Sequence, residues 1–233
     1  MDLMEAIKAR HSVRRYTDQR IEGETAERLR QVIAECNQES GLSIQLCLDE
    51  PKAFSGLMVK YGNIQNVRNF VALIGEKKPG LDEACGYYGE RIVLEAQRIG
   101  LNTCWIGASY SKRNAAAAVR IAPGEKMALV IAIGYGATQG APRKSKPMER
   151  LCRCEGEMPD WFRRGMEAAI LAPTAMNQQK FLFTLEGGAV RATTGAGPFA
   201  KVDLGIAKYH FEIGSGVECR ANYKKINNKE KTE

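Results

Sequence analysis

Apolar residues recur along the chain with two different periods, which predicts a mixture of helices and strands. Apolar positions three and four residues apart predict helices over residues 24–35, 81–99, 111–119, 161–171 and 202–213. Alternating or continuous apolar runs predict strands over residues 42–48, 70–74, 103–107, 127–133, 181–185 and 189–193. The last two strands flank Gly187-Gly188, which favours a hairpin. The strand at 127–133 is apolar throughout, so we expect it to be central in its sheet.

The order helix, loop, strand and later a glycine-ended helix occurs in both parts of the chain. Two glycine pairs share one internal spacing, Gly89 with Gly100 and Gly205 with Gly216. Residues 155–159 are typical of a junction, which predicts a division into 1–154 and 155–233. Because proteins with both helices and strands reuse this order freely, the pattern alone leaves duplication and chance similarity open.

The composition is that of an ordinary globular protein, with 44% hydrophobic and 26% charged residues in a chain of 233. No apolar run reaches the roughly 18 residues of a membrane span, and the first residues lack the apolar core of a signal peptide. The seven cysteines are an odd number, which favours reduced thiols in the cytoplasm. Cys152 and Cys154 have no second pair at metal-ligand spacing, so we expect no metal site.

The net charge of +7 suits either a nucleic acid or a phosphorylated small molecule as partner. The basic residues are scattered, with concentrations only at 143–146 and in a polar tail from Asn222 that we expect to be frayed. Zinc-finger spacing and RNA-binding aromatic signatures are both missing from the sequence. We therefore expect a small-molecule partner, with no nucleic acid and no membrane.

The strongest candidate for chemistry is the cluster Arg10-His11-Ser12-Val13-Arg14, which follows a short amphipathic run. Guanidinium groups bind phosphate with two parallel hydrogen bonds, and Ser and His can donate to the same oxyanion. The alternative interpretation is an ordinary solvated helix end, for which basic clusters are common.

Three further stretches have distinctive sequences. Residues 94–107 join the end of a long helix to a glycine turn and an apolar strand. Gly-Tyr-Gly at 134–136 precedes the basic segment 143–147, and residues 172–179 have the sequence Ala-Pro-Thr-Ala-Met-Asn-Gln-Gln. With the cluster at 10–14, these stretches resemble the motifs of the nitroreductase family, flavin-dependent enzymes that carry FMN. In that family the corresponding motifs are Arg-x-Ser-x-Arg/Lys, the glycine turn, the basic closing segment and Ser-Pro-Ser-x-x-Asn-x-Gln-Pro-Trp.

The order of these motifs departs from the usual one. Ordinary members have the Pro-Ser-x-x-Asn motif after the first long helix, where this chain has residues 37–41, and they hold FMN at a homodimer interface. Here each half has flavin elements that the other lacks, as in the single-chain, internally duplicated branch of the family. The resemblance implies an α+β fold with a central, mostly antiparallel sheet flanked by helices, in two fused pseudo-equivalent halves. It also implies one FMN per chain, in a pseudo-dimeric monomer or a weak homodimer.

Carried over motif by motif, the resemblance assigns roles to the first half of the chain. Arg10, His11 and Ser12 would hold the FMN phosphate and ribityl chain. Arg14 would face the N1/O2 edge of the ring, where a fixed cation raises the reduction potential. Backbone N–H groups of Ile106 and Gly107 would lie near N5 and O4. Arg143 and Lys146 would complete the binding site of the FMN phosphate, although the resemblance leaves open which of Arg143, Lys144 and Lys146 contacts it.

From the second half, the resemblance assigns a loop to the dimethylbenzene and ribityl side of the flavin, formed by Pro173, Thr174, Ala175 and Asn177. Each of these residues has a purely structural alternative, such as ending a helix or capping a turn. Lys180-Phe181 replaces the family's Pro-Trp, so the local packing there is open. Lys60 and Asn63 are weaker candidates for the pyrimidine edge.

The function implied is FMN-dependent oxidoreduction, with NADH or NADPH as donor and a nitroaromatic, a quinone or a similar small molecule as acceptor. We assign no catalytic side chain, because the cofactor performs the chemistry while the protein positions it. The alternative is a flavin-binding store or redox sensor without turnover.

Overall fold

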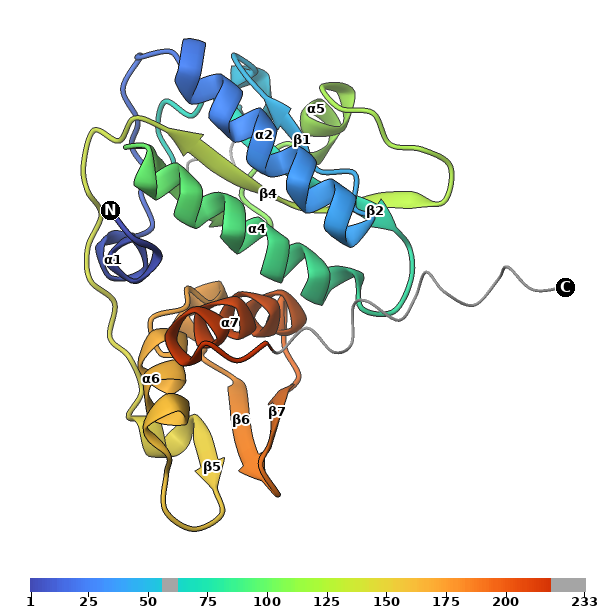
Figure 1. Ribbon diagram of the computed structural model, residues 1–233. Helices are drawn as coiled ribbons and strands as arrows, with labels where there is room; N and C mark the ends of the chain where they lie inside the picture. The colour runs from blue at the N-terminus through green and yellow to red at the C-terminus, as the bar shows by residue number, and fades with distance from the viewer. Residues whose placement is uncertain (56–62, 219–233) are drawn as a thin grey trace, which may run out of the picture. The chain divides into compact units, whose positions relative to one another are not determined.

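The computed structural model describes residues 1–55 and 63–218, which form two compact units. Unit 1 comprises Met1–Leu81 and Gly89–Lys144, and unit 2 comprises Asp82–Tyr88 and the chain from Ser145 onward. The helix α4 (Leu81–Arg98) contributes residues to both units. Figure 1 shows the elements of each unit. The predicted frayed tail from Asn222 lies outside the described residues.

Unit 1 is built on a four-stranded sheet in the order β1-β2-β4-β3. Its strands are β1 (Gln45–Cys47), β2 (Asn69–Glu76), β3 (Asn102–Ile106) and β4 (Glu125–Gly134). All neighbouring strands are antiparallel, and residues of β2 and β4 fill the buried centre. The prediction that 127–133 is central is therefore confirmed. Strand β3 lies at the edge, in register with β4 so that Ile106 is opposite Val130.

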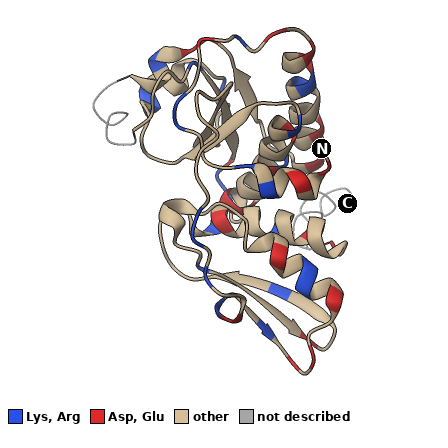
Figure 2. Ribbon diagram, turned by 90° about the vertical axis from the view of Figure 1, so that its left-hand side faces the viewer, with Lys and Arg blue, Asp and Glu red and all other residues tan. Residues whose placement is uncertain are grey.

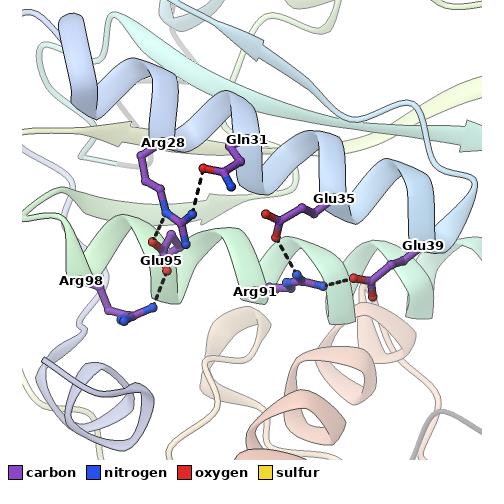
Figure 3. Close-up of polar contacts among 7 residues, drawn as sticks. All are labelled: Arg28, Gln31, Glu35, Glu39, Arg91, Glu95 and Arg98. Atoms are coloured by element: carbon purple, nitrogen blue, oxygen red, sulfur yellow. Dashed lines mark hydrogen bonds and ion pairs between the residues drawn. The ribbon is translucent and has the colours of Figure 1, made fainter.

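Two long helices, α2 (Gly23–Ser40) and α4, lie side by side in unit 1 against the sheet (Figure 1). The Arg91 guanidinium contacts the carboxylates of Glu35 and Glu39, at 2.8 and 2.7 Å (Figure 3). Glu95 is held in the same way by Arg28 and Arg98. Partly exposed ion pairs stabilise little, so these contacts orient the helices while apolar burial holds them.

Shorter elements complete unit 1. Helix α1 (Leu3–Ala9) begins with a capping box, in which Asp2 and Glu5 exchange backbone and side-chain hydrogen bonds of 2.8 Å. Helix α5 (Lys112–Ala117) is capped by the Ser111 side chain. A 3-10 helix, η1, spans Pro51–Phe54. Glycines in the left-handed region end both long helices, Gly41 after α2 and Gly100 after α4.

Unit 2 is built on a three-stranded sheet in the order β5-β6-β7. Strands β6 (Phe181–Glu186) and β7 (Ala189–Thr194) form the predicted hairpin, and β5 (Cys152–Cys154) pairs in parallel with β6. Helices α6 (Asp160–Ala169) and α7 (Ala200–Ser215) supply its core with the strands. In that core Phe211 stacks on Phe183 at 4.7 Å between ring centroids and meets Phe162 edge-on.

The first turns of α4 pack on α7 within unit 2 at two glycines. A Cβ at Gly205 would overlap the Glu83 carbonyl oxygen, and one at Gly86 would overlap the Val202 carbonyl oxygen. The two backbones therefore touch, which only glycine allows. Lys208 pairs with Glu83 beside this crossing, so a buried ammonium is neutralised.

The structure differs from the sequence expectations in two places. Cys152–Cys154 is a strand that the apolar pattern did not predict, because three residues are too few to show alternation. This strand pairs with β6 of unit 2. The longer of the two segments of that unit starts at Ser145, before the division predicted between residues 154 and 155. The strand predicted at 42–48 shortens to β1. In the part of the chain that the structure describes, no helix is both long enough and apolar enough to cross a membrane.

Candidate cofactor site

The cluster at 10–14 is bound to the sheet of unit 1 through its backbone. Helix α1 ends at Ala9, and Val13 then donates its N–H to the Thr103 carbonyl at 3.0 Å. Farther along, Thr17 donates to the Tyr135 carbonyl at 2.8 Å, just beyond β4. The cluster therefore runs beside edge strand β3.

Arg10 is the most informative residue of the cluster. Its side chain is buried, with 3% of the residue exposed. Within the described structure, its Nε and Nη1 atoms have no hydrogen-bond partner. A buried guanidinium without acceptors is costly, by about 1–3 kcal/mol or more for each unsatisfied charged donor. Such a group fits an anion that binds at this place, as the phosphate of a nucleotide would.

Two further basic groups share the surroundings of Arg10. Burial and the charge of Arg10 lower the pKa of Arg143 to about 10. Burial, followed by the charges of Arg10 and Arg143, lowers the pKa of His11. The charges of Arg10 and Arg143 therefore act together in one positive region that includes His11. Figure 2 shows the Lys and Arg residues in blue and the Asp and Glu residues in red, with both kinds present in both units.

The backbone that follows β4 contacts the cluster at Gly140. Its φ is +74°, and a Cβ there would lie 2.7 Å from the His11 Cβ and 3.0 Å from the Ser12 carbonyl oxygen. A glycine is therefore required both by conformation and by space. This contact holds the segment that leads to Arg143 against the motif.

Gly140→Ala is expected to lower the free energy of unfolding by about 2–3 kcal/mol, since strain in the left-handed region adds to a steric clash. Urea denaturation measures the loss. Gly124→Ala is the matched control, because Gly124 has a φ of +87° but open space around its Cβ position. Equal losses in the two variants would show that the contact with His11 and Ser12 is unimportant.

The other predicted residues of unit 1 lie along the same edge. Ile106 ends β3 with its side chain buried, and Gly107 follows half-buried. Burial raises the pKa of Cys104, while the charges of Arg14 and Arg10 and a hydrogen bond with Ser12 oppose the rise. Arg14 and Ser12 therefore lie near β3. Five predicted residues, Arg10, His11, Ser12, Arg14 and Arg143, therefore lie near one another or near β3, while Ile106 and Gly107 are at the end of that strand.

The predicted residues of the second half gather in a loop of unit 2. It contains the 3-10 helix η3 (Ala175–Asn177), in which Met176 and Asn177 have φ values near +50°. Left-handed backbone at non-glycine residues is strained and is common at binding sites. The Thr174 hydroxyl accepts the Gln179 N–H at 3.1 Å, and Pro173 is buried before it. The loop is therefore built by specific hydrogen bonds.

Lys146 also lies in unit 2 and binds this loop. Its ammonium donates to the carbonyls of Gln178 and Gln179 at 2.8 and 2.9 Å. Arg143, by contrast, belongs to unit 1 with Arg10. Of the basic closing segment, Arg143 and Lys144 thus belong to unit 1 and Lys146 to unit 2. Lys60, a weaker candidate, lies outside the described residues, and Asn63 has a φ of 51° in a turn.

Sequence reasoning missed Asp203, the residue that fastens this loop. Its carboxylate accepts the Ala175 N–H at 2.9 Å and the Gln178 side-chain amide at 2.7 Å. The available signal was an acidic residue in the first turn of the helix predicted at 202–213. Burial raises the pKa of Asp203 to about 6, and the two hydrogen bonds oppose this rise.

This pKa predicts how stability depends on pH. Between the unfolded value of about 4 and the folded value of about 6, the folded chain holds the proton more tightly. The free energy of unfolding should therefore fall by about 2 kcal/mol as the pH rises from 4 to 6, and by about 0.3 kcal/mol more up to pH 7. Denaturation of the wild type and of Asp203→Asn across that range measures the difference. A parallel pH dependence of the two proteins would contradict the assignment.

Comparison with solved structures shows that this architecture is the nitroreductase fold. A structure from Thermotoga maritima MSB8, described as a putative nitroreductase, has a TM-score of 0.65 and 24% identity, and covers 92% of this chain and 83% of its own. A protein from Desulfovibrio desulfuricans, described as a putative nitroreductase in complex with FMN, has a TM-score of 0.50 and 21% identity over 68% of this chain and 98% of its own. No curated protein matches the chain.

The family can be stated more narrowly from the sequence. The model of the family described as "Putative TM nitroreductase" matches residues 2–215, which is nearly the whole chain. The chain therefore belongs to this nitroreductase family. The predicted membership of the nitroreductase family is confirmed, while the internal duplication stays a prediction.

Proposed function

We propose that the chain binds FMN and is an oxidoreductase that uses NADH or NADPH to reduce a small molecule such as a nitroaromatic or a quinone. The observation that carries this proposal is the buried Arg10 guanidinium, whose Nε and Nη1 atoms await acceptors within the described structure. Membership of the nitroreductase family and the FMN complex of the Desulfovibrio protein support the choice of flavin.

The basic cluster of unit 1 would hold the FMN phosphate. Arg10 and Arg143 supply guanidinium donors, and a phosphate dianion would relieve the repulsion between them. His11 and the Ser12 hydroxyl offer further donors from the same segment. The backbone bonds of Val13 and Thr17 to the sheet fix this segment before the ligand arrives, so little ordering remains to be done on binding.

The remaining assignments concern the flavin ring. Arg14 would place a cation at the N1/O2 edge, and the backbone at Ile106 and Gly107 would approach N5 and O4. The strained loop with Pro173, Thr174, Ala175 and Asn177 is proposed, on the motif resemblance, to contribute to the same cofactor. When bound, FMN would supply the redox chemistry between the nicotinamide donor and the acceptor. The chain's own residues then need only bind, orient and tune it, which requires no side chain as acid or base.

Anaerobic titration of the FMN-loaded protein with NADH and with NADPH tests the reaction. Bleaching of the flavin absorbance by either nucleotide, followed by reoxidation with a quinone, is the expected result. A flavin that stays oxidised with both nucleotides would overturn the reductase and leave the store or sensor. Titration of Arg15→Met is the control for a change in surface charge, because the Arg15 side chain is exposed and directly follows the cluster at 10–14.

A further inference from the structure

Asn102, the first residue of β3, is a buried polar residue to which the motif resemblance gives no role. Only 6% of the residue is exposed. Its Oδ1 atom accepts the backbone N–H of Gly136 at 3.0 Å, and its Nδ2 atom donates to Oε1 of Gln139 at 3.1 Å. A backbone N–H can only donate, so the oxygen of the amide must face Gly136 and its NH2 group must face Gln139. The buried amide therefore links β3 to the chain that follows β4.

That chain forms a loop, residues 135–140, which is also bonded to the backbone just beyond the cluster. The Ala137 N–H donates to the Arg15 carbonyl at 2.9 Å. The preceding residue, Gly136, directs its N–H to Asn102 instead. A Cβ at Gly136 would lie 2.6 Å from Oδ1 of Asn102, so the glycine lets the backbone approach the buried amide. The 135–140 loop is thus held from two sides.

The 135–140 loop reaches the cluster at its last residue, Gly140. An added Cβ there would lie 2.7 Å from the His11 Cβ and 3.0 Å from the Ser12 carbonyl oxygen. The cluster in turn is bonded to Thr103, the neighbour of Asn102 in β3, whose carbonyl accepts a backbone N–H of the cluster at 3.0 Å. Two consecutive residues of β3 therefore hold the two segments that meet at Gly140.

We propose that Asn102 is a positioning residue for the phosphate site: its amide fixes the 135–140 loop on the strand that also holds the cluster, and so sets the path of the backbone that leads to Arg143. This inference rests on the proposed function, because it treats the cluster and Arg143 as phosphate ligands. Loss of the amide would misplace these donors. The backbone of β3 at Ile106 would stay paired with β4, so the proposed ring contacts would remain.

FMN and riboflavin differ only in the phosphate group, so the ratio of their affinities reports on the phosphate site. Fluorescence titration of flavin-free Asn102→Leu with each flavin measures this ratio. We expect the affinity for FMN to fall by about tenfold, as when one charged hydrogen bond is lost, and that for riboflavin to change by about twofold at most. A side chain that only stabilises the fold would lower both affinities in the same proportion, and that result would overturn the inference.

Asn69→Leu is the matched control. Asn69 is the first residue of β2, opposite Ile133 near the end of β4, and 8% of it is exposed. Its Oδ1 atom accepts the Asp49 N–H at 3.0 Å, so this buried amide holds a different loop. The variant should lose stability but keep the wild-type ratio of FMN to riboflavin affinity. Equal losses of FMN affinity in Asn69→Leu and Asn102→Leu would also overturn the inference.

Gln139→Ala keeps the test decisive if Asn102→Leu folds poorly. Gln139 is exposed, so the substitution removes the acceptor of the Asn102 NH2 group without opening the core. We expect about threefold weaker FMN binding and unchanged riboflavin binding, because one neutral hydrogen bond is lost. Unchanged FMN binding in this variant would contradict the role of the link. A wild type that binds FMN no more tightly than riboflavin would instead overturn the proposed function, because the cluster would then not be a phosphate site.

Discussion

Replacing Arg10 by Met is expected to weaken FMN binding by about 100-fold or more. The variant removes the charged donors proposed for the phosphate, and each charged hydrogen bond contributes about 1.5–3 kcal/mol. Fluorescence titration of flavin-free protein with FMN measures the affinity. Arg15→Met should bind FMN nearly as tightly as the wild type does. The substitution lowers the net charge, but the Arg15 side chain is exposed and is not one of the proposed phosphate ligands.

Arg10→Met should have the opposite effect on the stability of the flavin-free protein. Arg10 buries a guanidinium with two unsatisfied donors in the described structure, and Met covers a similar volume without charge. Flavin-free Arg10→Met is therefore expected to unfold at an equal or higher urea concentration than the wild type. This combination, a stable fold that has lost its ligand, marks a binding residue. A variant that binds FMN with wild-type affinity would remove the basis of the phosphate assignment.

Gly205→Ala is expected to destabilise unit 2 by about 3 kcal/mol. The new Cβ would overlap the Glu83 carbonyl oxygen and lie 2.7 Å from the Tyr87 nitrogen, so α7 and residues 82–88 of α4 must separate. Helix propensity alone would stabilise the variant by about 1 kcal/mol, because Ala is the better helix former. The predicted decrease in stability is therefore opposite in sign to the effect of helix propensity. Calorimetry should show the unfolding temperature lower by about 6–12 °C.

Gly195→Ala controls for glycine removal in the same unit. An added Cβ there would be in ordinary contact with Lys180, at 3.9 Å. Its stability should stay within about 0.5 kcal/mol of wild type. If Gly205→Ala were as stable as the control, the close packing of α7 on α4 would not be a determinant of unit 2.

Much of the fold could be predicted from local pattern. The helices α2, α4 and α7 and the hairpin β6-β7 each carry a full apolar period or a glycine signal within their own residues. The division of the chain could not be predicted in the same way. Helix α4 is continuous in sequence, yet residues 82–88 belong to unit 2, because Gly86 and Gly205 permit a contact between residues far apart in the chain.

The candidate site, like the fold, could be predicted only in part from the sequence. The Arg10–Arg14 motif identified the donors, but its burial depends on backbone bonds to Thr103 and Tyr135, which sequence spacing does not reveal. Asn102 and Asp203 were missed because asparagine and aspartate side chains are usually solvated. Only packing shows that one holds the backbone of Gly136 and the other that of Ala175.

The most direct test of the central claim is the absorption spectrum of the purified chain after incubation with FMN and removal of unbound flavin. We predict the bands of oxidised flavin at one FMN per chain in the wild type and in Arg15→Met, and their loss in Arg10→Met. A wild-type protein that remains colourless after this treatment would contradict the account, because the buried cluster would then not be a flavin phosphate site.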